Sequence, residues 1–409
     1  MKFCLIGEKL SHSYSKEIHN LCGIDYSLKE IVRCGVGDFV CGSSFDGFNV
    51  TIPYKKEVIP FLDGVSNEVK EIGAVNTVAN KNGKRIGYNT DVNGILYTLK
   101  RKGVSLKDKN VLVLGTGGAS KAVEYVIKNQ NGNCILVSRS GDINYENCYN
   151  VKAVKVIINA TPVGTFPNFQ DCPIDLEKFK GLEFVFDLVY NPQKTTLIKK
   201  AEELGILCSN GLPMLVEQAL SAQDIWLDKT HSKALTEEII SKLSKDKLNV
   251  ALTGMPGCGK STIGNLLSKK LNKTFIDLDV EISNYAKKTP QEIINELGES
   301  EFRKIETEVL KKVLLNTGTV IALGGGAFIS EENRELLSHS AVTVYVKRDL
   351  ELLKTCGRPL SKTIGVKKLF EEREVFYNTA DFSVDNNGDI NLAVKEIIVK
   401  YENTRSKWT

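Results

Sequence analysis

Two glycine-rich stretches decide how this chain folds: VLVLGTGGA at residues 111–119 and NVALTGMPGCGKST at residues 249–262. Each begins with an apolar run of β-type residues, continues through a glycine-rich turn and opens a helical pattern. A strand, turn and helix of this kind bind phosphate groups, because glycine lets the backbone approach and the helix N-terminus favours negative charge. The sequence therefore predicts an α/β protein with two phosphate-binding units.

Apolar runs on both sides of these stretches extend the pattern. Around the first stretch, strands are predicted at 1–6, 46–52, 134–137, 154–159, 184–188 and 206–208. Around the second, strands are predicted at 275–277, 320–322 and 342–346. Strands that alternate with helical segments imply crossover connections and parallel sheets. The polar stretch Ser241–Lys247, after a helix-rich segment, is predicted to be the linker between the two halves.

Composition excludes several classes of protein. The chain has 409 residues, which predicts two or three domains, and a net charge of only +4, without the basic excess of a nucleic-acid binder. No apolar run approaches the roughly 18 residues of a membrane span, and the N-terminus lacks a signal-peptide pattern. The ten cysteines include no CxxC pair, which favours free thiols over disulfides or zinc. We expect a cytoplasmic protein that binds neither nucleic acid nor membrane.

The turn Gly115-Thr116-Gly117-Gly118-Ala119 is a candidate dinucleotide site. Its third fingerprint position is Ser120, so the match to GxGxxG/A is imperfect and a tight turn without a ligand stays an alternative. The next predicted strand ends in Val137-Ser138-Arg139-Ser140 and lacks the acidic residue typical of NAD sites. A guanidinium and two hydroxyls suit a 2′-phosphate, which favours NADP(H), although a solvated surface arginine is the alternative.

Lys55 and Asp91 are candidates for proton transfer. Reduction of a ketone by hydride leaves a developing alkoxide, which a lysine beside a carboxylate can protonate. Lys55 ends the segment Asn49-Val50-Thr51-Ile52-Pro53-Tyr54-Lys55, and Asp91 ends Asn89-Thr90-Asp91. Taken singly, each residue is better explained as an ordinary surface charge.

With these residues, the chain resembles the shikimate dehydrogenase family over about residues 1–245. The matching motifs are Gly7…His12-Ser13-Tyr14-Ser15, Asn49–Lys55, Gly73–Thr77, Asn89–Asp91, Gly115–Ala119, Asn159–Thr161, Asp187–Pro192 and Gly211…Met214-Leu215…Gln218. The resemblance implies NADPH-dependent reduction of 3-dehydroshikimate to shikimate, with Lys55 as general acid/base aided by Asp91. Ser13 and Ser15 would hold the substrate carboxylate. The other substrate residues would be Thr51, Asn76, Asp91, Tyr190 and Gln218. The coenzyme residues would be Gly115, Thr116, Gly117, Gly118, Ala119, Ser138, Arg139, Ser140, Leu188 and Gly211.

The chain departs from the family in the loop for the carboxylate. Lys9 and Lys16 stand where proline is usual, and Tyr14 stands where lysine is frequent. Because proline fixes loop geometry, this loop could be looser here, or the added cations could favour an acidic substrate. His12 and His19 are expected to be structural or surface residues.

The second stretch satisfies the P-loop pattern GxxxxGK[ST]. The backbone of Gly257-Cys258-Gly259-Lys260-Ser261-Thr262 would cradle phosphates, Lys260 would neutralise charge and Ser261 would bind Mg²⁺. Cys258 is expected to be a small filler rather than a nucleophile. Asp277 and Asp279 are predicted to share one face of a strand, where they could support Mg²⁺ and orient an acceptor hydroxyl. A simple turn at the end of the strand is the alternative.

Further motifs make residues 248–403 resemble the shikimate kinase family. They are Gly298-Glu299…Phe302-Arg303…Glu306, Leu323-Gly324-Gly325-Gly326, Arg358-Pro359-Leu360 and Glu372-Arg373…Tyr377. The resemblance implies that Asp279 binds the substrate hydroxyls and assists deprotonation, while Arg303 and Arg373 clamp the carboxylate. Gly325 would contact the substrate through its backbone, Asp277 would position Mg²⁺, and Arg358 would close with a short lid onto ATP.

The two resemblances predict the complete organisation. The expected α/β domains are a substrate-binding domain at 1–95 and 213–244, a Rossmann-like NADP domain at 96–212, and a P-loop NMP-kinase-like α/β/α domain at 248–409. The implied function is bifunctional, with reduction of 3-dehydroshikimate followed by ATP- and Mg²⁺-dependent phosphorylation of shikimate. The nearest alternative is a relaxed quinate/shikimate dehydrogenase fused to another small-molecule P-loop kinase. A ligand sensor built from degenerate enzyme domains would bind without turnover. The chain could be a monomer or a homodimer.

Overall fold

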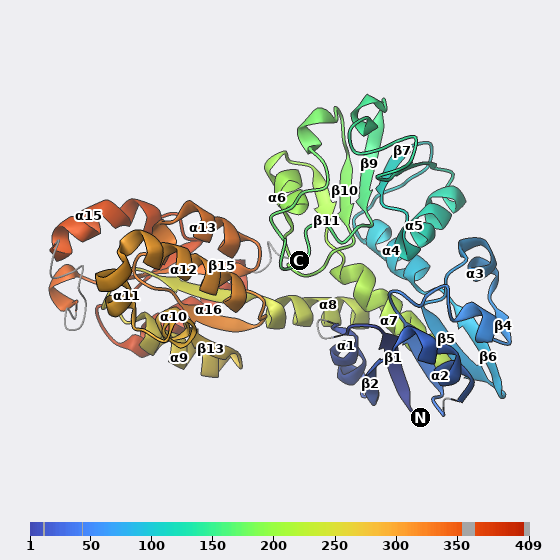
Figure 1. The fold of residues 1–409 in the computed structure, drawn as a ribbon, viewed down its shortest axis with the longest axis horizontal. Coiled ribbons are helices and arrows are strands. Elements are labelled where there is room, and N and C mark those ends of the chain that lie inside the picture. The colour runs from blue at the N-terminus through green and yellow to red at the C-terminus, as the bar shows by residue number, and fades with distance from the viewer. Residues whose placement is uncertain (11–12, 43, 354–364, 405–409) are drawn as a thin grey trace. The chain divides into compact units, whose positions relative to one another are not determined.

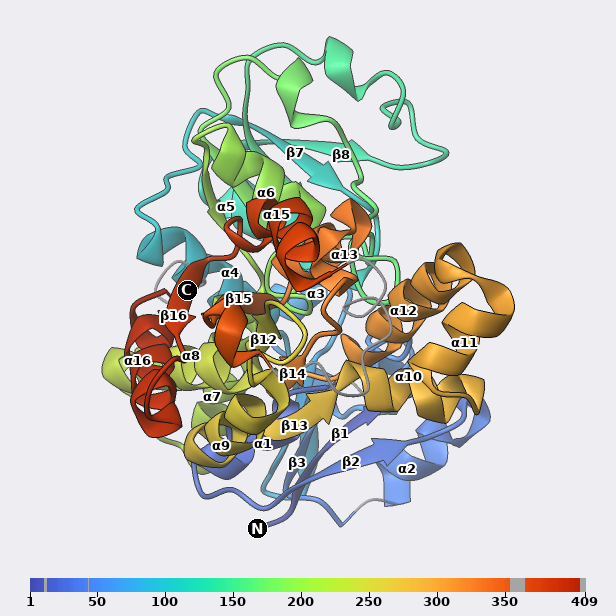
Figure 2. The same ribbon diagram turned by 90° about the vertical axis from the view of Figure 1, so that its left-hand side faces the viewer.

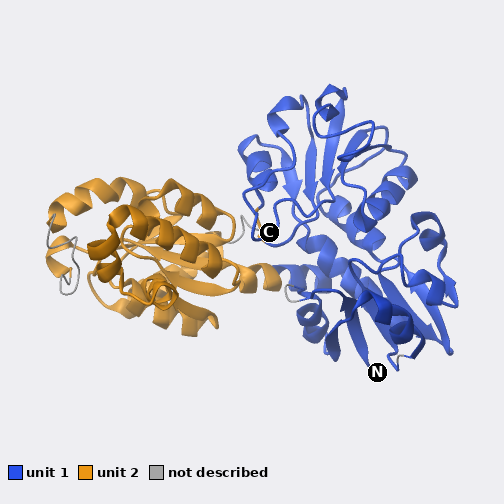
Figure 3. Cartoon of the chain, in the orientation of Figure 1, with its two compact units in different colours: residues 1–191, 195–241 blue, residues 192–194, 242–409 orange. Residues whose placement is uncertain are grey.

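The structure, a computed structural model, describes all residues except 11–12, 43, 354–364 and 405–409. Its elements form three β-sheets with flanking helices (Figure 1). By contacts, the chain divides into unit 1, residues 1–191 and 195–241, and unit 2, residues 192–194 and 242–409 (Figure 3). Among the described residues, no helix has both the length and the apolar character needed to cross a membrane.

The first sheet of unit 1 is mixed and has the strand order β2-β1-β3-β5-β6-β4. Its strands are β1 (Phe3–Gly7), β2 (Tyr26–Glu30), β3 (Gly47–Val50), β4 (Gly64–Val65), β5 (Thr77–Lys81) and β6 (Lys84–Tyr88). Its helices are α1 (Ser15–Leu21), α2 (Val36–Gly42), α3 (Asn67–Ile72) and α7 (Leu212–Leu227). The β5–β6 hairpin is not among the predicted strands, although Asn82-Gly83, both with positive φ, is a strong signal for such a turn.

The second sheet of unit 1 is entirely parallel, as the alternating pattern predicts, with the order β11-β10-β9-β7-β8. Its strands are β7 (Asn110–Leu114), β8 (Asn133–Val137), β9 (Val154–Asn159), β10 (Phe184–Asp187) and β11 (Leu207–Ser209). The helices around it are α4 (Asp91–Arg101), α5 (Gly118–Asn129) and α6 (Thr196–Glu203). Val111–Leu114 of β7 are fully buried because helices cover both faces of such a sheet, so the run is apolar without alternation.

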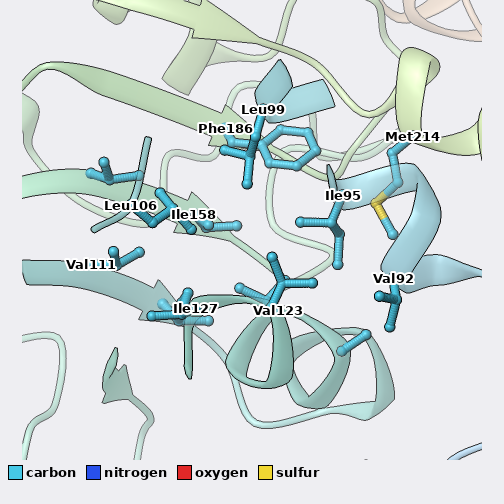
Figure 4. Packing of buried hydrophobic residues seen from close by; sticks show 14 of the residues in the cluster. Val92, Ile95, Leu99, Leu106, Val111, Val123, Ile127, Ile158, Phe186 and Met214 are labelled. Atoms are coloured by element: carbon cyan, nitrogen blue, oxygen red, sulfur yellow. The ribbon is translucent and has the colours of Figure 1, made fainter. Parts of the chain in front are cut away.

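One hydrophobic cluster positions the two helices of unit 1 that begin at predicted site residues. Val92, Ile95 and Leu99 of α4 pack with Val123 of α5 and with the parallel sheet (Figure 4). Burying each such side chain contributes about 1.5–3 kcal/mol. Because α4 begins at Asp91 and α5 begins at the glycine-rich turn, this packing brings the carboxylate and the turn to the same part of the unit.

Unit 2 contains the third sheet, also parallel, with the order β13-β14-β12-β15-β16. Its strands are β12 (Asn249–Thr253), β13 (Thr274–Asp277), β14 (Thr319–Ala322), β15 (Ala341–Lys347) and β16 (Phe382–Asp385). Its helices are α9 (Lys260–Leu271), α10 (Leu278–Ala286), α11 (Pro290–Leu297), α12 (Glu299–Val313), α13 (Glu331–Ser338), α15 (Val366–Tyr377) and α16 (Ile390–Thr404). Helices α10, α11 and α12 contact one another and form a group beside the sheet (Figure 2).

The predicted linker at Ser241–Lys247 coincides with the boundary between the two units, but its residues form the last turns of a helix, α8 (Lys233–Lys247). Leu243 and Ser244 within the polar stretch are buried, and Lys242 pairs with Asp246 at 3.1 Å on the helix surface. The Nζ of Lys273 donates to the carbonyls of residues 245, 246 and 248 at 2.8–3.0 Å, which satisfies the exposed end of the helix. The stretch is polar in composition, but it forms a helix with buried residues on one side.

Candidate active sites

Unit 1 contains a pocket of about 450 Å³ that gathers most of the residues predicted for the dehydrogenase site. The predicted substrate residues that line it are Ser13, Ser15, Thr51, Lys55, Asn76, Asp91, Tyr190 and Gln218. The predicted coenzyme residues that line it are Ala119, Leu188 and Gly211. Lining residues without a predicted role are Leu5, Lys9, Leu10, Asn49, Val50, Met214 and Leu215. Lys9 could have been predicted as a lining residue, because it lies close in sequence to the predicted carboxylate loop.

Lys55 and Asp91 form the centre of this pocket. The Nζ of Lys55 lies 2.5 Å from Oδ2 of Asp91, and both side chains are largely buried. Asn76 donates from Nδ2 to the other carboxylate oxygen of Asp91 at 2.8 Å, and the same amide nitrogen lies 3.4 Å from Oε1 of Gln218. A carboxylate held on both oxygens orients the ammonium group, which is the arrangement that a proton donor needs.

The first glycine-rich turn lies next to this pair. Gly115 has a φ of +100°, and a Cβ there would lie 2.9 Å from the Thr161 side chain, so the turn requires glycine. A Cβ built at Gly118 would lie 3.6 Å from Cδ of Lys55, which places the start of α5 beside the lysine. Arg139 and Ser140 are exposed just beyond the end of β8, and Ser138 is half-buried. These residues fit a dinucleotide whose pyrophosphate lies on α5 and whose 2′-phosphate meets Arg139.

Asp187 organises the segment that leads to Tyr190. This carboxylate is fully buried at the end of β10 and accepts hydrogen bonds from Thr195 Oγ1 at 2.6 Å, Asn159 Nδ2 at 2.9 Å and the Val189 amide at 3.0 Å. Burial raises the pKa of Asp187 to about 7, although these hydrogen bonds oppose the rise. These hydrogen bonds therefore hold the start of the segment that follows β10 in place.

Substitution Asp187→Asn is expected to remove a pH dependence of stability in unit 1. Between the ordinary pKa of 3.8 and the raised value of about 7, the folded state holds a proton that the unfolded state has released, so stability falls as pH rises through this window. The asparagine keeps the acceptor for Asn159 and Val189 but does not titrate. Between pH 5.5 and pH 7, the free energy of unfolding of the Asp187→Asn variant should rise by about 2 kcal/mol relative to that of the parent chain.

Urea unfolding followed by the fluorescence of Trp226, which is buried in unit 1, measures this difference at the two pH values. Asp171→Asn, which replaces an exposed aspartate, is the control and should show the same pH dependence as the parent chain. Equal pH dependence in the parent chain and in Asp187→Asn would contradict the assignment.

Of the two histidines near the carboxylate loop, the structure describes His19. His19 is fully buried, stacks on Tyr26 with a ring distance of 4.0 Å, and its Nδ1 lies 2.8 Å from Nε2 of Gln223. Burial lowers the pKa of His19 to about 3, so the ring is neutral near pH 7. The position is a structural one. His12 lies outside the described residues.

Unit 2 contains a second pocket, of about 780 Å³, around the P-loop. The predicted kinase residues that line it are Gly257, Gly259, Lys260, Ser261, Thr262, Asp277, Asp279, Arg303, Gly325 and Arg373. Cys258 is fully buried, as expected for a filler. Arg358 lies outside the described residues, as does the rest of the predicted lid at 354–364. Lining residues without a predicted role include Phe302, Glu306, Arg348 and Asn386.

The P-loop has the backbone that phosphate binding requires. Gly254, Gly257 and Gly259 have φ values of +137°, +91° and +101°, and α9 begins at Lys260. The Nζ of Lys260 donates to the carbonyls of Gly254 at 2.9 Å and Met255 at 3.1 Å, so the ammonium group lies inside the loop. The loop therefore fits the phosphates of a nucleotide.

The predicted common face of Asp277 and Asp279 is wrong. Strand β13 ends at Asp277, and Asp279 lies in the first turn of α10, because the Asp277 side chain accepts from the Asp279 amide at 3.1 Å and caps the helix. The hydroxyl of Ser261 donates to Oδ2 of Asp277 at 2.6 Å. Ser261 and Asp277 therefore present adjacent oxygen atoms, which fit Mg²⁺ together with nucleotide phosphates. Asp279 does not belong to this strand, and it lies among a second group of pocket residues.

This second group of pocket residues contains Asp279 and the two predicted arginines, Arg303 and Arg373. A Cβ at Gly324 would lie 2.9 Å from oxygen atoms of both Asp279 and Glu306. Arg303 pairs with Glu306 at 2.8 Å, and Arg373 donates to the carbonyl of Gly325 at 3.1 Å. Burial raises the pKa of Glu306, against the lowering effect of Arg303. The pocket therefore presents two guanidinium groups and a carboxylate in addition to the P-loop.

Comparison with known proteins identifies both halves. The family model described as the shikimate dehydrogenase substrate binding domain matches residues 5–78, and the model described as shikimate kinase matches residues 256–402. The shikimate dehydrogenase (NADP(+)) of Caldicellulosiruptor bescii is 39% identical over 264 residues, which cover 56% of this chain and 89% of that protein.

Solved structures agree with these matches for unit 1. A chorismate mutase/shikimate 5-dehydrogenase fusion protein from Clostridium acetobutylicum is 36% identical with a TM-score of 0.57, covering 60% of this chain and 97% of that one. Shikimate 5-dehydrogenase from Thermus thermophilus, solved with NADP(H) and shikimate, is 28% identical with a TM-score of 0.54, covering 59% and 99%. The chain therefore belongs to the shikimate dehydrogenase family, and its residues 256–402 match the shikimate kinase model, which confirms the fold class and both resemblances inferred from the sequence.

Proposed function

We propose that the two pockets act on the same ring acid in succession. Unit 1 reduces 3-dehydroshikimate to shikimate with NADPH, and unit 2 phosphorylates the 3-hydroxyl of shikimate with ATP and Mg²⁺. The observation that supports this most directly is the pair Lys55–Asp91 beside a dinucleotide turn in one unit, combined with two arginines and a P-loop in one pocket of the other. Both pockets offer groups for a carboxylate, hydroxyls in the first and guanidinium groups in the second.

In the first reaction, NADPH supplies the hydride, and this chain supplies the proton. Lys55 donates it to the developing alkoxide, while the ion pair with Asp91 holds the ammonium group in the pocket. Asn76 holds Asp91 through its second oxygen, so the carboxylate cannot rotate away. Ser13 and Ser15 hold the substrate carboxylate, and Thr51, Tyr190 and Gln218 complete the walls.

In the second reaction, ATP with Mg²⁺ supplies the phosphoryl group. Lys260 and the loop amides neutralise the phosphates, and Ser261 with Asp277 holds the metal ion. Arg303 and Arg373 bind the shikimate carboxylate in bidentate fashion. Asp279 orients the attacking hydroxyl and accepts its proton, and Gly325 contacts the ring through its backbone. The resemblance assigns Arg358, which lies outside the described residues, to the nucleotide.

A coupled assay tests both reactions together. The purified chain receives 3-dehydroshikimate, NADPH and MgATP, and the formation of shikimate 3-phosphate is followed alongside the oxidation of NADPH. Both products should appear in succession. Failure to reduce 3-dehydroshikimate, or failure to phosphorylate added shikimate, would refute the corresponding half of the proposal. Equal activity on quinate would instead support the relaxed dehydrogenase.

Lys9 is expected to contribute to affinity in the first reaction. This exposed lysine lines the pocket with Ser13 and Ser15, so its charge faces the proposed carboxylate site. A charge near a partly solvated anion contributes about 1 kcal/mol, which corresponds to about a fivefold change in KM. Lys9→Met should raise the KM for 3-dehydroshikimate by this factor, with little change in kcat and with a smaller effect at high salt.

Lys16→Met is the matched control, because Lys16 is exposed on α1 and carries the same charge. Steady-state kinetics at low and high ionic strength should leave its KM unchanged. If both variants behaved alike, the effect of Lys9 would be one of net charge and not of position.

A further inference from the structure

Arg348 is a half-buried arginine in the pocket of unit 2 to which the proposed kinase mechanism gives no role. It follows β15 directly, and β15 is the parallel neighbour of β12, which leads into the P-loop. Because parallel strands end at the same edge of a sheet, Arg348 and the P-loop lie at one edge. A Cβ built at Gly259 would lie 3.8 Å from Nη1 of Arg348, so the guanidinium reaches the turn just before Lys260.

The described residues leave the guanidinium of Arg348 incompletely hydrogen-bonded. Its Nε is buried, and among the residues that the structure describes no atom accepts a hydrogen bond from it. A buried donor without an acceptor is costly, on the order of 1–3 kcal/mol. Arg303 differs, since Glu299 and Glu306 pair with it. A guanidinium that lines a pocket and has a buried nitrogen without a partner among the described residues is placed to receive an anion from outside the chain.

The surroundings of Arg348 identify the side of the pocket to which it belongs. Asn386 is buried and donates from Nδ2 to the carbonyl of Cys258 at 2.7 Å, which ties the loop after β16 to the P-loop. A Cβ at Gly259 would lie 2.6 Å from this same Nδ2, so Asn386 and Arg348 both contact the P-loop at Gly259. In contrast, Arg303 approaches Gly326, in the loop after β14. Arg348 therefore lies on the nucleotide side.

We propose that Arg348 is an additional ligand for the phosphate chain of the nucleotide. The proposal rests on the kinase activity proposed for this pocket and assigns to it a cation outside the P-loop. The P-loop amides and Lys260 bind the phosphates from within the loop, and Arg348 reaches them from the adjacent strand. A guanidinium suits this place because its planar fork can donate two hydrogen bonds to one phosphate.

Equilibrium titration of the full chain with MgADP and with adenosine tests the assignment without relying on turnover. Arg348→Met should weaken MgADP binding about tenfold, which is the loss of one good charge-assisted contact. Adenosine affinity, the KM for shikimate and the dehydrogenase activity should not change. Arg348→Lys, which keeps a point charge without the fork, should lose less than Arg348→Met. Lys347→Met, an exposed neighbour outside the pocket lining, is the control for net charge.

Three results would overturn the assignment. Unchanged MgADP affinity in Arg348→Met would remove any role in binding, and equal weakening of adenosine would assign Arg348 to the base. Equal weakening in Lys347→Met would reduce the effect to net charge. Thermal unfolding of each variant identifies a folding defect. If Arg348→Met has one, the MgADP affinity of Arg348→Lys is compared with that of the parent chain instead. If the parent chain bound MgADP but did not phosphorylate shikimate, the proposed function would fail while the role of Arg348 would stand.

Discussion

Lys55→Met should abolish the oxidation of NADPH by 3-dehydroshikimate while leaving the phosphorylation of added shikimate intact. The variant removes the proton donor but keeps most of the apolar stem, so the pocket retains its volume. Loss of a positioned general acid costs up to about 10⁴-fold in rate, and we expect a decrease in kcat of at least about 10³-fold. The 2.5 Å contact with Asp91 makes this the largest expected effect in unit 1.

The measurement is the rate of NADPH oxidation at saturating substrate, with shikimate kinase activity assayed on the same preparation. Lys56→Met is the matched control, because Lys56 is adjacent in sequence and exposed. It should retain full activity. A Lys55→Met chain that is folded but has lost both activities would contradict two independent sites. A decrease of less than tenfold would exclude Lys55 as the proton donor.

Lys260→Ala should have the converse effect, with loss of shikimate phosphorylation and an unchanged dehydrogenase. Lys260 is largely buried and its Nζ lies within the P-loop, where the charge of the phosphates has to be neutralised. Removing one electrostatic contact of this kind costs about 10²–10³-fold in kcat. We expect the upper end of this range, because no water can replace a buried ammonium group at equal strength.

Phosphorylation is followed by the release of ADP in the presence of shikimate, and NADPH oxidation is recorded in parallel. Lys270→Ala, at the exposed end of the same helix α9, is the control and should not affect either rate. Thermal unfolding of the Lys260 variant separates loss of catalysis from collapse of the loop. Retention of more than a tenth of the kinase activity would show that this lysine is not essential to the site.

The local motifs could be interpreted correctly because their meaning depends on a few consecutive residues. The turn at Gly115 and the loop at Gly254–Thr262 each contain their strand, glycine positions and helix start within one segment, so they predicted the fold class that the structure confirms. In contrast, Asp277 and Asp279 were assigned to a strand because the sequence alternates, whereas a side-chain cap ends the strand between them. The choice between strand and cap was decided by a single hydrogen bond.

The two phosphate-binding turns, the parallel sheets and the family of each half could be inferred from the amino-acid sequence, because these depend on local spacing and on apolar runs. Which distant residues meet could be seen only in the folded chain. Asn76 reaches Gln218 across 142 residues, Gly118 lies beside Lys55, and Arg348 reaches the P-loop from another strand. The physical reason is that such contacts arise when sheets and helices bury their apolar faces together. That packing has no signature in any short stretch of the chain.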